Sequence, residues 1–279
     1  MVRRLRRWGR LGSLAVPRLA AQGRGFFIPH RLAGRVRPPS GYPAIEPCFA
    51  GTTAEFRRQL TGAARYLPQF LGFGGAPPAP RFEQDWFPRL DAALAYTLVR
   101  ERKPRRIVEI GSGHSTRVMA RAVADGGGGG QLVSVDPEPR ARLDGLAVEW
   151  IRRPIQEVAE GMLGDFTATD ILFVDSSHAL APGSDVDCIL AMLLPRIPPG
   201  GAVHFHDIFL PDAYPESWSW RGYNEQNALV PLIAGGGWRL LWSSHWVATR
   251  MVRDVAASGL GRLPLMAGAF ESSLWLEKL

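Results

Sequence analysis

The stretch at residues 108–116, which reads VEIGSGHST, decides the fold class of this chain of 279 residues. It begins inside an apolar run typical of a buried strand, Arg106–Ile110, continues through glycines at positions 111 and 113, and enters a segment with helical spacing. Ser115 or Thr116 can cap the N-terminus of that helix. Glycine lets the backbone turn tightly and lets a ligand approach the main chain. The stretch therefore predicts a strand, a tight turn and a helix, the place where doubly wound sheets bind their ligands.

Strand-like and helix-like segments alternate around this stretch. Short apolar segments typical of strands lie at residues 106–110, 131–135, 148–151, 170–174, 202–206, 238–242 and 272–276. Segments with helical spacing lie at residues 90–102, 115–124, 137–146, 185–194 and 224–234. This alternation predicts an α/β fold with a Rossmann-like, doubly wound parallel sheet that carries helices on both faces.

Charge divides the chain into an arm and a body. The net charge is +7, but residues 1–37 hold ten arginines and no acid, which leaves 23 basic and 26 acidic residues elsewhere. The body lacks the basic stripe that nucleic-acid binding needs, so we expect no nucleic-acid partner. We expect a basic arm at residues 1–37, an irregular cap and linker with one helix (53–65) at residues 38–80, and the main domain at residues 81–279.

Residues 1–16 carry an apolar side chain at every third position, with arginines between them. This pattern is typical of a basic amphipathic helix on an anionic membrane surface. A solvated arm and an organelle transit peptide are the alternatives. No apolar run approaches the roughly 18 residues that span a bilayer, and two cysteines are too few for a disulfide scaffold. We therefore expect a cytoplasmic protein, with peripheral contact at the inner membrane surface if the arm binds lipid.

An acid at the end of the second predicted strand points to a nucleoside ligand. Asp136 lies 23 residues after Gly113, where a carboxylate accepts hydrogen bonds from ribose hydroxyls. A dinucleotide and S-adenosylmethionine both fit this spacing. The dinucleotide pattern has a third glycine where this chain has Thr116, and a carboxylate at Glu109 facing the crevice would repel a pyrophosphate. The same carboxylate suits a ligand that carries an amino group and a sulfonium, so S-adenosylmethionine is favoured.

At these residues the chain resembles the class I S-adenosylmethionine-dependent methyltransferases. The resemblance covers residues 86–279 and rests on five stretches: VEIGSGHST (108–116), SVDPEPR (134–140), DILFVDSSH (170–178), GGAVHFHDIF (200–209) and SSLWLEK (272–278). It implies a seven-stranded sheet with an antiparallel last strand, and it makes residues 81–279 the methyltransferase domain. A closer likeness to bacterial methyltransferase-like proteins found near glycan or secondary-metabolite genes implies a small-molecule or glycan substrate.

The resemblance also implies a set of residues that bind S-adenosylmethionine. Glu109, Gly111 and Gly113 would line the methionine part, and Asp136 would hold the ribose. Gln156, or its neighbour Glu157, is the candidate for the adenine end. The complete expected set is Glu109, Gly111, Ser112, Gly113, Ser115, Asp136, Gln156 and Asp175.

Polar side chains at the ends of the fourth and fifth predicted strands are the candidates for chemistry. Asp175 and His178 follow one strand, and His206 and Asp207 follow the other, so we expect them to converge. In one mechanism His178 or His206 is the general base, with Asp207 beside it. In the other, Asp175 and Asp207 hold Mg²⁺ or another divalent cation. Relatives that use magnesium show acid pairs where this chain has a histidine followed by an aspartate.

The predicted function is transfer of a methyl group from S-adenosylmethionine to a hydroxyl, or less readily an amine, of a small molecule or glycan. A nicotinamide-dependent oxidoreductase is the second hypothesis, and a non-catalytic, membrane-associated scaffold with this fold is the third. The aromatic run at residues 218–226 is interpreted either as a lid over the substrate or as core anchors.

Overall fold

The computed structural model describes residues 37–139 and 141–279. Nearly all of the predicted basic arm, including residues 1–16, lies outside the described residues, so contact of the arm with a membrane stays a prediction. Within the described ranges, no helix has the length and apolar character needed to cross a bilayer.

Seven strands form one mixed sheet in the order β3-β2-β1-β4-β5-β7-β6. Their bounds are β1 Arg106–Ile110, β2 Gln131–Val135, β3 Glu149–Ile151, β4 Ile171–Val174, β5 Ala202–Phe205, β6 Trp238–Ser243 and β7 Leu274–Lys278. Neighbouring strands from β3 to β5 are parallel, whereas β7 runs antiparallel to both β5 and β6. The predicted Rossmann-like, doubly wound sheet with an antiparallel last strand is confirmed.

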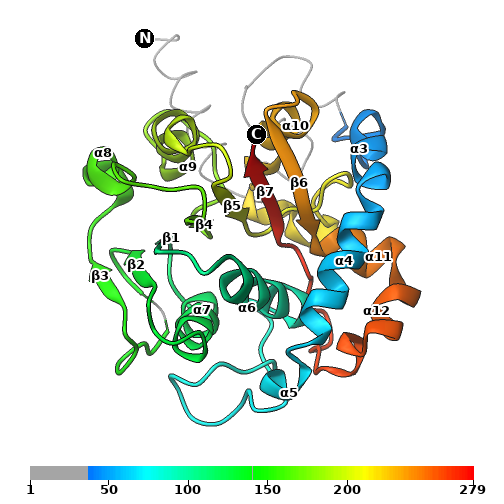
Figure 1. The fold of residues 1–279 in the computed structure, drawn as a ribbon. Coiled ribbons are helices and arrows are strands. Elements are labelled where there is room, and N and C mark those ends of the chain that lie inside the picture. Colours follow the sequence, from blue (N-terminus) through cyan, green and yellow to red (C-terminus); the bar gives the residue numbers. More distant parts are fainter. Residues whose placement is uncertain (1–36, 140) are drawn as a thin grey trace, which may run out of the picture.

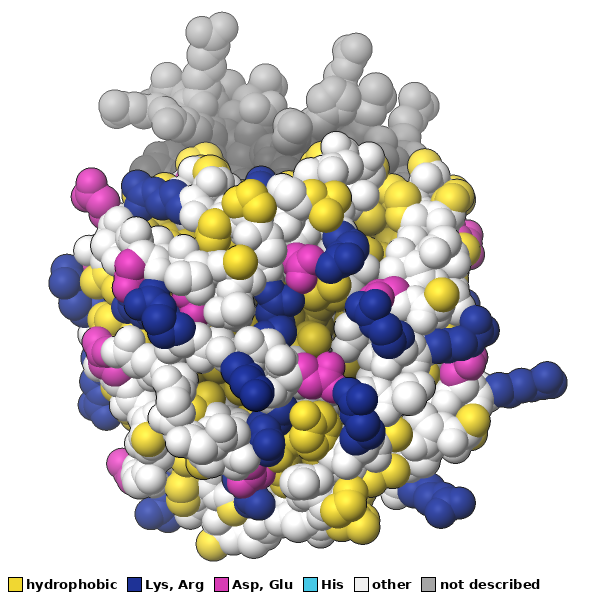
Figure 2. Space-filling model, in the orientation of Figure 1, with side chains coloured by type: hydrophobic (Ala, Val, Ile, Leu, Met, Phe, Trp, Pro, Cys, Tyr) yellow, Lys and Arg dark blue, Asp and Glu magenta, His cyan; other side chains and the backbone are white. Residues whose placement is uncertain are grey.

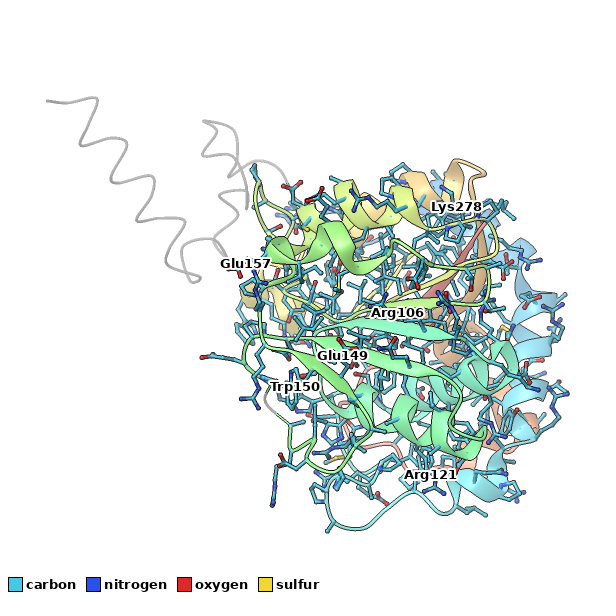
Figure 3. All side chains as sticks on the ribbon, turned by 60° about the vertical axis from the view of Figure 1, so that its left-hand side comes forward. Arg106, Arg121, Glu149, Trp150, Glu157 and Lys278 are labelled. Carbon is cyan, nitrogen blue, oxygen red and sulfur yellow. The ribbon has the colours of Figure 1, made fainter. Side chains whose placement is uncertain are left out.

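Helices cover both faces of the sheet (Figure 1). One face carries α6 Arg89–Arg102 and α7 His114–Asp125, and the opposite face carries α8 Ala159–Met162, α9 Asp185–Cys188 and α10 Glu225–Ala234; Figure 3 shows the same two layers from another side. The remaining α-helices are α3 Glu46–Gly51, α4 Thr53–Ala64, α5 Leu67–Phe70, α11 Ser244–Arg250 and α12 Val252–Ser258.

The central strands are buried on both sides because helices cover both faces. Every residue of β4 and β5 is buried, as are four of the five residues of β1. Strands of this kind are nearly continuous apolar runs, which is why the sequence pattern identified them.

The segment before the main domain is more helical than expected. The predicted helix at residues 53–65 is confirmed as α4, and α3 and α5 flank it. Aromatic side chains hold this cap on the main domain: Phe49 packs on Trp246, Phe56 on Trp242, and Phe70 on Tyr96. Each buried ring contributes roughly 1.5–3 kcal/mol through the hydrophobic effect. The boundary at residue 80 stays a prediction.

Two predicted helices differ from the structure. The helix expected at residues 137–146 is wrong, because the described residues there form bends and turns. Pro139 disfavours the helical backbone conformation of the residue before it, Glu138, and Gly145 adopts φ +87°, outside the right-handed helical region. The helix expected at residues 185–194 begins as predicted but becomes a π-helical turn at Ile189–Leu193 and then a 3₁₀ turn at Leu194–Arg196.

Hydrogen bonds extend the sheet by one residue at the carboxyl ends of four strands. The amides of Gly111, Asp136, Asp175 and His206 donate to Val135, Ile151, Ile110 and Val174 at 2.9–3.1 Å. The first residue after each of β1, β2, β4 and β5 is therefore fixed beside its neighbour. The face drawn in Figure 2 shows basic and acidic side chains interspersed among exposed hydrophobic ones.

Candidate active site

The two glycines after β1 have different tasks. Gly111 adopts φ +87°, and a Cβ added there would lie 1.9 Å from the carbonyl oxygen of Asp175. Only glycine lets the ends of β1 and β4 approach so closely. A Cβ added at Gly113 would meet nothing within 4 Å. Gly111 is therefore required by the sheet itself, whereas Gly113 leaves space beside the main chain.

Glu109 lies beneath this loop and is completely buried. Its carboxylate oxygens accept hydrogen bonds from Ser115 Oγ at 2.7 Å and Thr116 Oγ1 at 2.8 Å. Burial raises the pKa of Glu109 to about 8, although both hydroxyl donors act to lower it. The expected position facing the crevice differs from this geometry, because Glu109 ties β1 to the first turn of α7.

Thr116 occupies the position of the missing third glycine and has a structural role there. The amide of Gly113 donates to Thr116 Oγ1 at 2.9 Å, while the same hydroxyl donates to Glu109. The Thr116 hydroxyl therefore forms hydrogen bonds with both the amide of Gly113, at the start of α7, and one oxygen of the buried Glu109 carboxylate. The hydroxyl of Ser115, a residue that is 2% exposed, donates to the other oxygen of the Glu109 carboxylate.

The end of β2 presents a partly exposed acid held in a fixed orientation. Ser112 Oγ donates to Asp136 Oδ2 at 2.6 Å, and the amide of Glu138 donates to Asp136 Oδ1 at 2.9 Å. The loop after Asp136 borders a surface hollow of about 610 Å³. Its lining includes Pro137, Leu143 and Trp150, and Figure 3 labels the last of these on β3.

Gln156 lies on a short 3₁₀ helix, Ile155–Glu157, and is exposed. Its Nε2 donates to the carbonyl of Gly183 at 3.1 Å, which links the segment after β3 to the segment after β4. Its role at the adenine end stays a prediction.

The ends of β4 and β5 bring four predicted side chains together. His178 Nε2 lies 3.3 Å from Asp175 Oδ1 and 3.5 Å from Asp207 Oδ2. His206 Nδ1 lies 3.6 Å from Asp175 Oδ1 and 3.4 Å from Asp207 Oδ1. The predicted convergence is confirmed, and each imidazole contacts both aspartates.

Two members of this group have unusual backbones. His178 adopts φ 58° and Asp207 adopts φ 56°, in the left-handed region that disfavours residues with a Cβ. Such a conformation costs roughly 1–3 kcal/mol and persists only where the surroundings enforce it. Two of these residues in contact indicate a functional site, which identifies this cluster as the candidate active site.

Two completely buried carboxylates support the histidines from behind. Glu225 Oε2, at the start of α10, lies 2.9 Å from His178 Nδ1. Asp91 Oδ2, in the first turn of α6, lies 3.3 Å from His206 Nε2 and also accepts from the amide of Ser272. The sequence analysis included Glu225 only within the aromatic run at residues 218–226 and missed Asp91. The available signal was an acid on the otherwise apolar face of a helix.

The charges in the cluster shift its pKa values together. Burial alone would lower the pKa of both histidines, but the surrounding carboxylates raise the pKa of His178 and of His206 well above the ordinary value. Burial alone would raise the pKa of Asp175, yet His206 and His178 hold it below the ordinary value. Burial raises the pKa of Glu225, although its bond to His178 opposes this.

The donor set does not fit the expected Mg²⁺ site. Among residues 37–139 and 141–279, no group of three or more His, Cys, Asp or Glu side chains is arranged to hold a metal ion. Magnesium prefers oxygen ligands in near-octahedral geometry. Here both aspartates instead contact imidazoles of raised pKa, so we assign no step to a metal.

His204, on β5, lies in a different environment from His206, which directly follows the strand. It is completely buried, its ring stacks on Phe173 with centroids 3.7 Å apart, and its Nε2 lies 2.8 Å from Ser273 Oγ. Burial keeps the pKa of His204 well below the ordinary value. This histidine belongs to the core.

Several aromatic side chains follow β5 along the chain, and one of them contacts His178 of the candidate active site. Trp218, in the 3₁₀ helix Glu216–Arg221, packs edge-on against Phe209, Phe270 and Tyr223. The Tyr223 ring lies 4.6 Å from the His178 ring. The two interpretations of this run, core anchors and a lid, each apply to one tryptophan. Trp218 is half-buried as an anchor would be, whereas Trp220 is 63% exposed, as a lid residue would be.

The solved structures to which the chain is similar include methyltransferases. An S-adenosylhomocysteine-bound methyltransferase of Podospora anserina is 16% identical, with 88% of this chain and 99% of that chain covered and a TM-score of 0.43. An O-methyltransferase of tomaymycin synthesis from Streptomyces achromogenes, in complex with S-adenosylmethionine, is 18% identical, with 79% and 89% covered and a TM-score of 0.41. An O-methyltransferase from Bacillus cereus in complex with S-adenosylhomocysteine is 12% identical, with 89% and 95% covered and a TM-score of 0.43.

No curated protein sequence matches the chain. Residues 108–208, which run from β1 to just beyond β5, match the family model described as a methyltransferase domain. This range holds the glycine turn, Asp136 and the four convergent side chains. The match to this domain and the strand order, with β7 inserted antiparallel between β5 and β6, agree with the resemblance of the chain to the class I S-adenosylmethionine-dependent methyltransferases.

Proposed function

We propose that this methyltransferase acts on a hydroxyl of a small molecule, with His178 as the general base and Glu225 as the residue that orients it. The observation that carries the proposal is the buried contact of 2.9 Å between Glu225 Oε2 and His178 Nδ1. It directs the second ring nitrogen toward Asp175 and Asp207 at the edge of the sheet. An amine acceptor and a glycan acceptor are compatible with the same geometry and are outcomes of the test.

The residues after β1 and β2 fit the methyl donor. Gly113 leaves space beside the main chain, and Asp136 offers partly exposed carboxylate oxygens to the ribose hydroxyls. Ser112 holds that carboxylate in place. When bound, S-adenosylmethionine supplies a methyl group on a positively charged sulfur, which leaves as the neutral thioether of S-adenosylhomocysteine.

His178 is held in place by its backbone as well as by its side chain. The amides of Asn224 and Glu225, at the start of α10, both donate to the carbonyl of His178, at 3.0 and 3.2 Å. Asn224 also bonds both backbone groups of Leu180 through its amide. The segment after β4 is therefore fixed to α10, and the imidazole can stay aligned while the acceptor oxygen loses its proton and gains the methyl group.

The carboxylates around His178 set the pH at which it can act. A base must be unprotonated, and the raised pKa of His178 keeps the proton on its ring at low pH. We expect kcat/KM to rise with pH as the imidazolium loses its proton, with a midpoint above the ordinary histidine value of about 6.5.

The test is methyl transfer from isotopically labelled S-adenosylmethionine to a panel of hydroxylated small molecules, amines and sugars, measured across pH. His178→Asn should lower kcat by roughly 10²- to 10⁴-fold, the usual contribution of a general base. Glu225→Gln should lower kcat less and move the pH midpoint downward, because it removes a negative charge that stabilises the imidazolium.

His245→Asn is the matched control, because His245 is also a histidine paired with an acid, but its partner is Asp212, at 2.6 Å, rather than an acid of the candidate active site. It should leave kcat within a few-fold of the original enzyme. Full activity in His178→Asn, or an unchanged pH midpoint in Glu225→Gln, would remove this pair from the mechanism. If His206→Asn alone abolished turnover, the base would be His206.

A further inference from the structure

The segment between β5 and α10 places an arginine beside the aromatic group that borders His178. The Arg221 guanidinium carbon lies 4.2 Å from the ring centre of Trp218 and 5.4 Å from those of Trp220 and Tyr223. Its Nη1 donates to the hydroxyl of Tyr223 at 3.0 Å. Three aromatic rings and one hydrogen bond therefore fix the position of an exposed cation.

No carboxylate of the described chain neutralises Arg221. The ion pairs within residues 37–139 and 141–279 include many arginines of the surface but not this one. A guanidinium that is held in place, but has no acid partner among these residues, retains N–H groups for an anion, and its planar fork matches a carboxylate.

The aromatic side chains around Arg221 are arranged for a flat ring. Trp218 meets Phe270 at 90° and Tyr223 at 84°, with ring centroids 5.4 and 6.0 Å apart, and we call these three side chains the aromatic corner. Phe270 is 37% exposed, which leaves apolar surface at this corner. A planar ligand can stack on one face and meet the edge of the next, the two arrangements that aromatic pairs prefer.

Recognition of a sugar needs several free hydrogen-bonding groups, and the nearest amide side chains are already engaged. Asn224 bonds the backbone of Leu180 through both amide atoms. Gln226 accepts from the amide of Phe209 and donates to the carbonyl of Asp212. The corner therefore favours an aromatic ring over a polyhydroxylated one.

We infer that Trp218, Tyr223 and Phe270 bind the ring of the methyl acceptor, that Arg221 binds its anionic group, and that the acceptor is a hydroxylated aromatic carboxylate. The inference rests on the proposed function and narrows its acceptor from small molecules and glycans to this class. The Tyr223 ring contacts both groups, because its centre lies 5.4 Å from the Arg221 guanidinium carbon and 4.6 Å from the centre of the His178 ring. An acceptor of the size of a single benzene ring can place its carboxylate and its hydroxyl near the two groups.

The experiment measures binding of 3,4-dihydroxybenzoate, catechol and glucuronate to the full chain by calorimetry, with S-adenosylhomocysteine present. Catechol keeps the ring and the hydroxyls without the carboxylate, and glucuronate keeps the carboxylate without the flat ring. We expect dihydroxybenzoate to bind roughly ten- to a hundredfold more tightly than catechol, the range for a hydrogen bond to a charged group. We expect glucuronate not to bind.

Two variants and a control identify the residues. Arg221→Met should abolish the preference for dihydroxybenzoate over catechol, and Trp218→Leu should weaken both ligands. Arg253→Met removes another exposed arginine, on α12, and should change neither affinity. Equal affinities for dihydroxybenzoate and catechol, a preference that survives Arg221→Met, or binding of glucuronate as tight as that of dihydroxybenzoate would overturn the inference.

Binding of S-adenosylhomocysteine is measured separately in the same variants. If that ligand binds and dihydroxybenzoate does not, the acceptor class is wrong while the proposed methyl transfer stands. If that ligand fails to bind the original protein, methyl transfer itself is wrong, whatever the aromatic corner binds.

Discussion

At the end of β1 two neutral hydroxyls surround the buried carboxylate of Glu109, whereas at the ends of β4 and β5 imidazoles contact the carboxylates of Asp175 and Asp207. Neutral donors offset only part of the cost of burying a charge, so the pKa of Glu109 rises to about 8. Imidazoles that can carry a positive charge have the opposite effect and lower the pKa of Asp175. Both regions are acidic, but only the second pairs its carboxylates with imidazoles, which can accept and release a proton.

The glycines show the same division between a structural and a functional part. Gly111 is enclosed by the backbone of β4, while Gly113 has open space beside it. The glycine turn thus has one residue that closes the sheet and one that leaves room for a ligand.

The largest expected effect comes from substituting these glycines separately. Gly111→Ala places a methyl group against the carbonyl of Asp175 at a positive φ, so β1 and β4 must separate. We expect a loss of more than about 4 kcal/mol in the free energy of unfolding, measured by chemical denaturation. Gly113→Ala is the matched control and should cost less than about 1 kcal/mol. Equal losses would contradict the division of roles.

Glu109→Gln should change how stability depends on pH. The folded pKa of about 8 lies above the unfolded value of 4.5, so the folded protein holds this proton more tightly. Its contribution is complete below pH 4.5 and is lost as pH rises through about 8. Between about pH 5.5 and 7.5 the original protein should lose roughly 2–3 kcal/mol more than Glu109→Gln.

Denaturation curves of the two proteins at several pH values measure this difference. Because the histidine cluster titrates in both, only the difference between them reports on Glu109. Parallel pH profiles would show that this carboxylate is ionised in the folded protein and that its hydroxyl partners are sufficient.

The sheet and the glycine turn could be predicted because their signals are local. Apolar runs mark strands covered on both faces, and the acid at the end of β2 lies at a fixed distance from the turn. One failure was local too, because Pro139 and Gly145 interrupt the helix that apolar spacing suggested at residues 137–146. The π-helical turn after α9 had no signal in the apolar spacing.

The supporting carboxylates could not be predicted, because they depend on contacts between distant parts of the chain. Asp91 is 115 residues from His206, and Glu225 is 47 residues from His178. The reason for Gly111 is likewise a carbonyl on another strand. Periodicity places a residue on a face of its own element and says nothing about which side chain the fold brings opposite.

The central claim is that the edge formed by β1 and β2 binds the methyl donor, and calorimetric titration of the full chain with S-adenosylhomocysteine tests it most directly. Asp136→Ala should weaken binding by about tenfold, which corresponds to about 1.4 kcal/mol. Asp144→Ala, which removes an acid that lines the hollow beside the loop after Asp136, should leave the affinity unchanged. The account predicts one binding site per chain with this pattern, and absence of binding to the original protein would contradict it.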